Sequence, residues 1–258
     1  MSMAILTDLT RCIGCEACVW ACKEINELPK ENDGGKLDST TWTTLRRYQG
    51  IHIRQQCMHC LNPTCVSVCP VAALEKTKEG PVIYHENRCM GCRYCILACP
   101  FEIPKYEWDN NLPKVQKCIM CYIKRISRGQ QPACTSVCPT GATQFGNRDE
   151  LINVARRRIE KNKDRYVDHI YGVQEAGGTS VLYLSDIPFH KLGFKKALND
   201  DTYPKLTWQV LSKIPNVVSV GSVLMLGIWW VIKRRMILEE QDLKEFEQKE
   251  TMDDQPGK

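Results

Sequence analysis

The sequence has little histidine and none of the short motifs that mark common enzyme sites. Gly177 and Gly178 belong to no G-x-G-x-x-G fingerprint, and the chain shows neither a phosphate-binding loop nor a nucleophile–base constellation. These absences exclude a recognisable dinucleotide, phosphate or hydrolase site and predict that the chain is not an enzyme in its own right. The five histidines also lack metal-ligand spacing: His52, His59, His85, His169 and His190.

Export and nucleic-acid signals are missing as well. The first residues, MSMAILTDLT, lack the charged start, apolar run and small-residue cleavage site of a secretory signal, and they contain no arginine pair. We therefore expect no export signal on this chain. The formal charge of +5 has no basic and aromatic surface motif beside it, so nucleic acid is not an expected partner.

Cysteine, in contrast, is abundant and regularly placed. The 258 residues include 16 cysteines, which form four groups of four with none left over. Groups one and three have the spacing C-x2-C-x2-C-x3-C, and groups two and four have a wider gap before the third cysteine. In chain order the groups are Cys12, Cys15, Cys18, Cys22; Cys57, Cys60, Cys65, Cys69; Cys89, Cys92, Cys95, Cys99; and Cys118, Cys121, Cys134, Cys138.

This spacing is typical of bacterial ferredoxins, in which the fourth cysteine of a motif ligates the other cluster of a pair. The four groups therefore predict four [4Fe-4S] clusters. Disulfides are disfavoured, because C-x2-C pairs close very small loops and nothing marks an oxidising export route. Zinc is disfavoured, because zinc sites do not require a third and a fourth cysteine at these intervals.

The residues around the cysteines fit the same chemistry. Gly14 and Gly91 lie between the first two cysteines of their groups, where backbone amides must approach the cluster sulfurs closely. Groups two to four end in Cys-Pro, and each proline should stop the short helix before it. Lys23 has that position in group one, where the alternatives are a raised local potential and a solvent-facing side chain, and we expect the side chain to face solvent. We expect His59, inside a C-x2-C pair, to fill space.

An internal repeat suggests how the groups pair. Residues 4–15 resemble residues 81–92, and groups two and four resemble each other, as expected of two ferredoxin modules with paired motifs. Groups two and three are adjacent, so we pair them and pair group one with group four. Crossover ligation then predicts four ligand sets: Cys12, Cys15, Cys18 with Cys138; Cys118, Cys121, Cys134 with Cys22; Cys57, Cys60, Cys65 with Cys99; and Cys89, Cys92, Cys95 with Cys69.

The predicted fold class is α+β, with two intertwined bacterial-ferredoxin-like modules and one C-terminal transmembrane helix. The four-cluster domain spans 1–148, with an inner module at 56–105 and an outer module at 1–25 and 115–145. A helix and strand extension follows at 149–212, then the transmembrane helix at 213–235 and a charged tail at 236–258, disordered or loosely helical.

The sequence also predicts the local structure of four further segments. Residues 26–50, with Pro29, Gly34 and Gly35, predict a loop followed by a short strand. Residues 122–133 carry basic side chains that we assign to a solvated helix face rather than to a cluster or partner contact. Residues 149–165 predict a helix whose apolar face holds Leu151, Val154, Ala155 and Ile159, and residues 179–184 predict a strand.

Residues 216–232, NVVSVGSVLMLGIWWVI, contain no ionisable side chain. At about 1.5 Å per residue they reach about 25 Å, near the lower limit for a bilayer core. Trp229 and Trp230, followed by Lys233, Arg234 and Arg235, favour a membrane span over a buried core helix. The positive-inside tendency predicts a cytoplasmic C-terminus and a body on the periplasmic side of the inner membrane, exported with a partner that carries a twin-arginine signal. A cytoplasmic body is the alternative.

Three segments resemble a known family: QCMHCLNPTCVSVCPVAAL (56–74), RCMGCRYCILACPFEIPKY (88–106) and PACTSVCPTGATQFG (132–146). They are similar to the four-cluster iron–sulfur subunits of membrane-bound molybdopterin enzymes and hydrogenases, nearest to those of formate dehydrogenase-N and hydrogenase-2. The likeness extends through GVQEAGGTSVLYLSDIPFHKLGF (172–194) and the C-terminal helix.

The resemblance implies the same crossover ligation and a non-catalytic subunit that relays electrons. Its implied partners are a catalytic subunit, with molybdopterin, tungstopterin or nickel-iron, an integral-membrane quinone-reactive or cytochrome b subunit, and membrane lipid. The cysteine pattern does not choose between formate dehydrogenase and hydrogenase. A free-standing membrane polyferredoxin that serves several redox partners is the alternative function.

Overall fold

A three-stranded sheet joins the two ends of the cysteine-rich sequence. Strand β1 (Met3–Asp8) pairs antiparallel with β8 (Thr143–Asn147) and parallel with β9 (Val181–Leu184), which gives the order β8-β1-β9. The β1–β8 register runs from Met3 opposite Asn147 to Thr7 opposite Thr143. The strand that precedes the first cysteine group therefore lies beside the strand that follows the last group.

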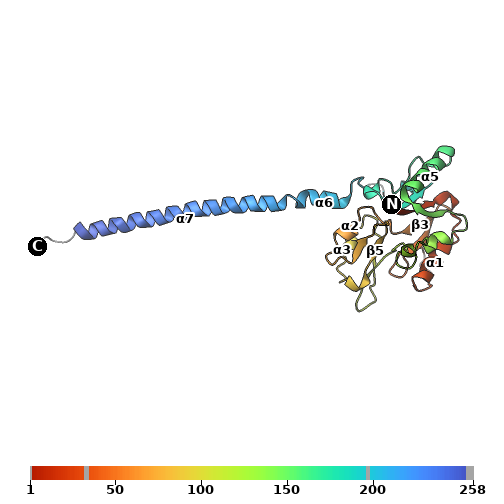
Figure 1. Ribbon diagram of the computed structural model, residues 1–258, viewed down its shortest axis with the longest axis horizontal. Coiled ribbons are helices and arrows are strands. Elements are labelled where there is room, and N and C mark those ends of the chain that lie inside the picture. The colour runs from red at the N-terminus through yellow and green to blue at the C-terminus, as the bar shows by residue number, and fades with distance from the viewer. Residues whose placement is uncertain (1, 32–34, 196–197, 254–258) are drawn as a thin grey trace. The chain divides into compact units, whose positions relative to one another are not determined.

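The computed structural model describes residues 2–31, 35–195 and 198–253 (Figure 1). Gly34 of the predicted loop and residues 254–258 of the predicted tail lie outside this described part. Within it, the residues up to Leu206 form one compact unit and those from Thr207 onward form a second. The first unit includes most of the predicted 149–212 extension, and β9, which pairs with β1, belongs to that extension.

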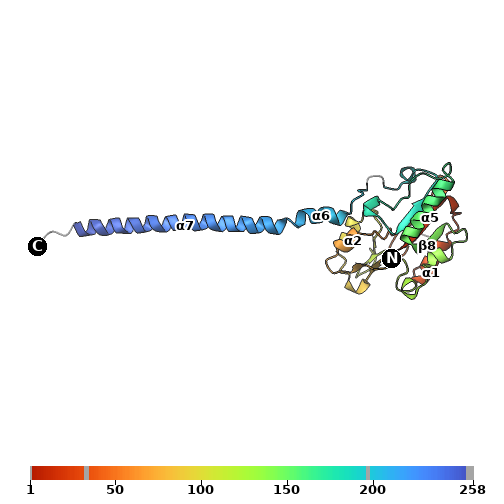
Figure 2. The same cartoon turned by 45° about the horizontal axis from the view of Figure 1, so that its top comes forward.

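Helix α5 (Arg148–Lys161) covers one face of this sheet, beside β1 and β8 (Figure 2). The side chain of Asn147 caps the helix by accepting a hydrogen bond from the Asp149 N–H at 2.9 Å. Leu151, Ala155 and Ile159 pack against the sheet, as the apolar periodicity predicted, and the helix ends four residues before the predicted limit. The opposite face contacts the cysteine-rich core, because successive strand residues point to opposite faces.

Three two-stranded hairpins complete the strand structure: β2 (Thr43–Tyr48) with β3 (Ile51–Gln56), β4 (Leu74–Lys76) with β5 (Val82–Tyr84), and β6 (Lys105–Tyr106) with β7 (Val115–Gln116). β2 confirms the strand expected after the loop, whereas β3 was not predicted. Gln49 and Gly50 form the β2–β3 turn, both at positive φ, as a two-residue hairpin turn requires.

Each cysteine group contains a short helix: α1 (Ala17–Ile25), α2 (Thr64–Ser67), α3 (Tyr94–Ala98) and α4 (Ala133–Ser136). α1 packs against α4, and α2 packs against α3. The three helices that precede a Cys-Pro pair have four or five residues, as the prolines predicted. α1 has nine residues, because Lys23 replaces the proline and the helix continues through it.

Short 3-10 helices occupy several of the connections. η1 (Leu9–Arg11) precedes the first cysteine of group one, and η2 (Glu86–Arg88) precedes the first cysteine of group three. The sequence repeat is therefore also a structural repeat. The 122–133 segment contains turns and η3 (Ile126–Arg128) instead of the predicted solvated helix. Lys124 in this segment bonds the Ile25 carbonyl and the Glu27 carboxylate, both at 2.7 Å. η4 (Glu175–Gly177) and η5 (Phe189–Leu192) flank β9.

The C-terminal part of the chain is helical. α6 (Tyr203–Leu211) precedes α7 (Ile214–Asp253), which contains the predicted span at 216–232. Among the described residues, the single helical stretch long and apolar enough to cross a membrane is Tyr203–Asp242, and its apolar part is not buried against the rest of the chain. The helix continues beyond residue 235, so the charged tail is helical as far as Asp253.

Candidate iron–sulfur site

The four C-x2-C loops share one backbone feature. The residue before the second cysteine has a positive φ in every group: 71° at Gly14, 48° at His59, 72° at Gly91 and 56° at Met120. In the fourth group the N–H of this left-handed residue, Met120, donates to Cys118 Sγ at 3.3 Å. The sequence singled out only the two glycines, because residues such as histidine and methionine adopt positive φ rarely.

Two small cavities are lined by four cysteines each. Cys12, Cys15 and Cys18 line one of them together with Cys138, which is distant in the sequence. The second cavity is lined by Cys69, Cys89, Cys92 and Cys95. In both cavities, three cysteines of one group therefore meet the last cysteine of another group.

Polar atoms without partners surround these cavities. The Thr7 hydroxyl and Nη1 of Arg54 are buried without a hydrogen-bond partner beside the first cavity, and the Tyr84 hydroxyl is buried without a partner beside the second. Unpaired buried donors are rare in proteins because they cost free energy. Sulfur atoms of a bound cluster would accept from them, so the lining fits an iron–sulfur group.

The other eight cysteines also gather in sets that cross between groups. Cys60 lies within electrostatic reach of Cys57, Cys65 and Cys99. Cys22, at the end of the first group, lies near three cysteines of the last group: Cys118, Cys121 and Cys134.

The sulfur atoms in these sets are spread more widely than the ligands of one ion. No three His, Cys, Asp or Glu side chains in the described ranges lie close enough to hold a single metal ion. The cysteines of each set are nevertheless mutual electrostatic neighbours or line a shared cavity. A polynuclear group, with one thiolate on each iron, fits this spacing better than one tetrahedral zinc.

Burial controls the protonation of these thiols. It raises the pKa of Cys18 and of Cys95 to about 11, and that of Cys65 and of Cys118 to about 12. Without metal these side chains are therefore neutral thiols at pH 7. Iron binding supplies the positive charge that makes them thiolates, so cluster assembly must release protons.

Cysteines of neighbouring sets lie within electrostatic reach of one another, from each set to the next. Cys95 lies near Cys65, and Cys57 of the second set lies near Cys118. Cys134 in turn lies near Cys18. The sets therefore form a row that starts at Cys69, Cys89, Cys92 and Cys95 and ends at Cys12, Cys15, Cys18 and Cys138.

Both ends of this row reach the surface. Cys15 is exposed, and its neighbour Ile13 is 63% exposed. At the other end Met90, between Cys89 and Cys92, is 66% exposed. The interior sets contain most of the buried cysteines: Cys22, Cys57, Cys118, Cys121 and Cys134.

Buried cations accompany the cysteines, and one of them corrects a prediction. Lys23 is 2% exposed rather than solvent-facing, and its ammonium donates to the Pro29 carbonyl at 3.0 Å and to the Thr41 hydroxyl at 2.9 Å. The half-buried Lys76 donates to the carbonyls of His59 and Cys60 in the second group, and the buried Lys117 donates to those of Val82 and Cys118. His59 is fully buried, and its Nδ1 accepts from the Val82 N–H at 2.9 Å, so it fills space and also fixes the β4–β5 hairpin.

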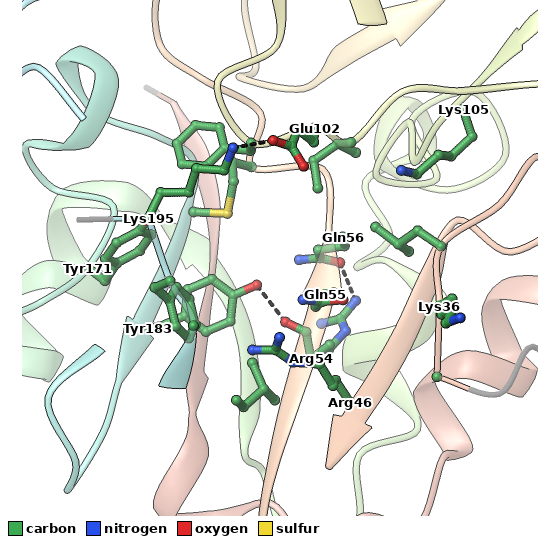
Figure 3. A pocket seen from close by; sticks show the side chains of 18 residues that line it. Lys36, Arg46, Arg54, Gln55, Gln56, Glu102, Lys105, Tyr171, Tyr183 and Lys195 are labelled. Atoms are coloured by element: carbon green, nitrogen blue, oxygen red, sulfur yellow. Dashed lines mark hydrogen bonds and ion pairs between the residues drawn. The ribbon is translucent and has the colours of Figure 1, made fainter. Parts of the chain in front are cut away.

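A larger cavity of about 460 Å³ lies beside β3 (Figure 3). Its charged lining is mostly cationic, and Glu102 pairs with Lys195 there. The Tyr183 hydroxyl donates to the Arg54 carbonyl at 2.8 Å. No cysteine or histidine lines this cavity among the described residues, so it belongs to none of the four cysteine sets.

Comparisons with known proteins agree with this site. The 4Fe-4S dicluster domain family matches residues 49–148. The hydrogenase-2 operon protein HybA of Escherichia coli O157:H7 is 38% identical over 241 residues, covering 76% of this chain and 73% of that protein. The nitrate-inducible formate dehydrogenase iron–sulfur subunit of E. coli K12 is 36% identical over 201 residues, covering 70% and 67%. The formate dehydrogenase iron–sulfur subunit of Haemophilus influenzae is 33% identical over 247 residues, covering 87% and 78%.

These relatives confirm the resemblance that the cysteine motifs indicated, to hydrogenase-2 and to formate dehydrogenase alike. The dicluster match covers groups two, three and four, and the HybA and formate dehydrogenase alignments extend over at least 70% of the chain. The chain belongs to the ferredoxin-like family of [4Fe-4S] electron-transfer subunits that includes the iron–sulfur subunits of formate dehydrogenase and the hydrogenase-2 protein HybA.

Proposed function

We propose that this chain is a non-catalytic subunit that passes single electrons between a catalytic oxidoreductase subunit and a quinone-reactive or cytochrome b subunit in the membrane. The observation that carries the proposal is the row of four cysteine sets whose two ends reach the surface. Bound [4Fe-4S] clusters supply one-electron acceptors and donors. The protein fixes their order, excludes water from the interior pair and exposes one end to each partner.

Four clusters and crossover ligation are part of this proposal. Two cysteine-lined cavities and two sets of electrostatic neighbours support it, together with the packing of α1 on α4 and of α2 on α3. The proposed ligand sets are Cys12, Cys15, Cys18, Cys138; Cys22, Cys118, Cys121, Cys134; Cys57, Cys60, Cys65, Cys99; and Cys69, Cys89, Cys92, Cys95.

The paired helices and hairpins support two intertwined modules. β4 and β5 close the inner module between groups two and three, and β1 and β8 close the outer module around groups one and four. In both modules an antiparallel strand pair joins the segment after one motif to the segment before the other. We also propose domain boundaries after residues 148, 212 and 235.

The membrane arrangement rests on α7. Lys233 lies over the Trp229 ring, with its ammonium 4.7 Å from the ring centroid, and Arg234 and Arg235 follow it. An interfacial aromatic followed by a basic cluster marks the cytoplasmic end of a span. We therefore place the C-terminus in the cytoplasm and the cysteine-rich body on the periplasmic side of the inner membrane. Protection of that body from protease in intact spheroplasts would contradict this orientation.

The function is tested in the purified complex. Removing this chain should leave the catalytic subunit able to reduce or oxidise an artificial dye, and it should abolish electron exchange with quinone. Quinone activity that survives the removal would refute the proposal. Recovery of the chain without a stoichiometric partner after gentle solubilisation would favour the free-standing polyferredoxin instead.

A further inference from the structure

Arg54 is a buried cation that no carboxylate accompanies. The residue lies on β3 and is 2% exposed. Its Nε donates to the Thr43 hydroxyl at 3.2 Å, and its Nη2 donates to the Gln56 side-chain oxygen (Figure 3). Both acceptors are neutral, and no ion pair of Arg54 occurs among the described residues. A buried cation without an anion nearby is strongly disfavoured.

The anions that could compensate this charge are cysteine thiolates. Arg54 lines the cavity of Cys12, Cys15, Cys18 and Cys138. It also lies within electrostatic reach of Cys22, Cys118, Cys121 and Cys134. The guanidinium is therefore located between two of the proposed ligand sets, and its Nη1 has no hydrogen-bond partner there.

The charge of Arg54 is permanent, because a guanidinium is not deprotonated in proteins. The Tyr183 hydroxyl holds the Arg54 carbonyl at 2.8 Å, which fixes the backbone from which the guanidinium extends.

Two lysines near the cysteines, the half-buried Lys76 and the buried Lys117, differ from Arg54. Lys76 donates to three backbone carbonyls, and Lys117 donates to two. These lysines satisfy carbonyl groups in the loops, which is a structural role. Arg54 instead has an unpaired N–H donor and a full charge between two cysteine sets.

Resting on the proposed four clusters, we propose that Arg54 sets the reduction potentials of two neighbouring clusters, those of Cys12, Cys15, Cys18, Cys138 and of Cys22, Cys118, Cys121, Cys134. Reduction adds one electron to a cluster, and a fixed positive charge nearby favours the more negative, reduced form. A single guanidinium shared by both clusters raises both potentials together. It therefore sets these two potentials higher relative to those of the other two clusters and leaves the step between the two unchanged.

The test is a potentiometric EPR titration of the full-length chain, assembled anaerobically, with Arg54→Met, Arg54→Gln and Arg54→Lys variants. Met and Gln remove the charge, whereas Lys keeps it. We expect loss of the charge to make reduction of these two clusters about tenfold less favourable, which is a fall of about 59 mV for a one-electron couple. The other two clusters should keep their potentials, and Arg54→Lys should restore most of the shift.

Several outcomes would overturn the proposal. One is four unchanged potentials in Arg54→Met or Arg54→Gln at full iron content, and another is an equal shift of all four clusters. Gln retains a side-chain amide for Thr43, so it serves where the Met variant fails to fold. Arg156→Met is the control, since Arg156 is exposed on α5 and lines neither cysteine cavity, so its loss should shift no potential. Wild-type chain without iron would instead refute the proposed function.

Discussion

Crossover ligation predicts which pairs of cysteine substitutions affect the same cluster. Cys138 belongs by sequence to the last group, yet it lines a cavity with Cys12, Cys15 and Cys18. Replacing Cys138 by Ala should therefore disturb the cluster that the first group holds. Replacing Cys118 should disturb a different cluster, the one that also uses Cys22.

The magnitude follows from the ligand sets. Four [4Fe-4S] clusters contain about sixteen irons, and one lost cluster removes up to about four. The double variant Cys138→Ala with Cys12→Ala should lose no more than about four irons, because both substitutions affect one cluster. Cys138→Ala with Cys118→Ala should lose up to about eight, because two clusters are affected.

Iron content per chain and low-temperature EPR together provide the assay. Iron analysis gives the loss, and EPR shows whether one or two cluster signals disappear or change to a three-iron form. Ser136→Ala, an exposed substitution on α4, is the control and should keep all the iron. The reasoning is refuted if Cys138 and Cys118 share one signal while Cys138 and Cys12 affect two.

Three further substitutions test the fold and the membrane helix. Gly172→Ala should destabilise the unit by about 1–3 kcal/mol, because φ is +101° and the new Cβ would meet the Val181 carbonyl oxygen. Arg158→Met should cost about 3–5 kcal/mol, because it leaves the fully buried Asp8 carboxylate without its cation. Both are measured as the temperature at which the visible cluster absorbance is lost. Leu224→Lys should cost about 2.5–3.5 kcal/mol in membrane insertion and move the chain from the membrane fraction to the soluble fraction.

Matched controls separate these effects from general disruption. Gly141 also has a positive φ, of 59°, but a Cβ there would meet nothing within 4 Å, so Gly141→Ala should cost less than Gly172→Ala. Arg156 is exposed on α5, and Arg156→Met should change little the temperature at which the cluster absorbance is lost. Equal effects within either pair would contradict the contacts on which the predictions rest.

The cysteine groups could be predicted from sequence because their chemistry is local. The spacing of the first two cysteines in a motif follows from the C-x2-C loop, and the residue before the second cysteine has a positive φ in all four groups. Helix lengths could be predicted from the same motifs, since Cys-Pro ends three helices and Lys23 lets the fourth continue. The apolar face of α5 was equally clear from its period.

Features that depend on distant contacts could not be predicted. The parallel pairing of β9 with β1 joins segments about 175 residues apart and leaves no local signal. Arg54-Gln55-Gln56 has the composition of an exposed strand, yet Arg54 and Gln56 are buried beside the cysteine sets. Lys23 was assigned to solvent because lysine is rarely buried, and only the fold shows the Pro29 and Thr41 oxygens that accept from it.

The inserted arrangement of the modules has a physical explanation. Closing the outer module brings β1 to β8 across the whole inner module, but the entropy of loop closure rises by only about 0.6 kcal/mol for each doubling of loop length. The insertion therefore adds little cost. In this account a metal site that closes a long loop gives the largest gain in folding stability. Each outer ligand set closes such a loop, because it joins residues before position 23 to residues after position 117. Shared ligation thus joins the two ends of the outer module at two ligand sets. Arg54 on β3, which lies between these ends in the sequence, is beside both sets.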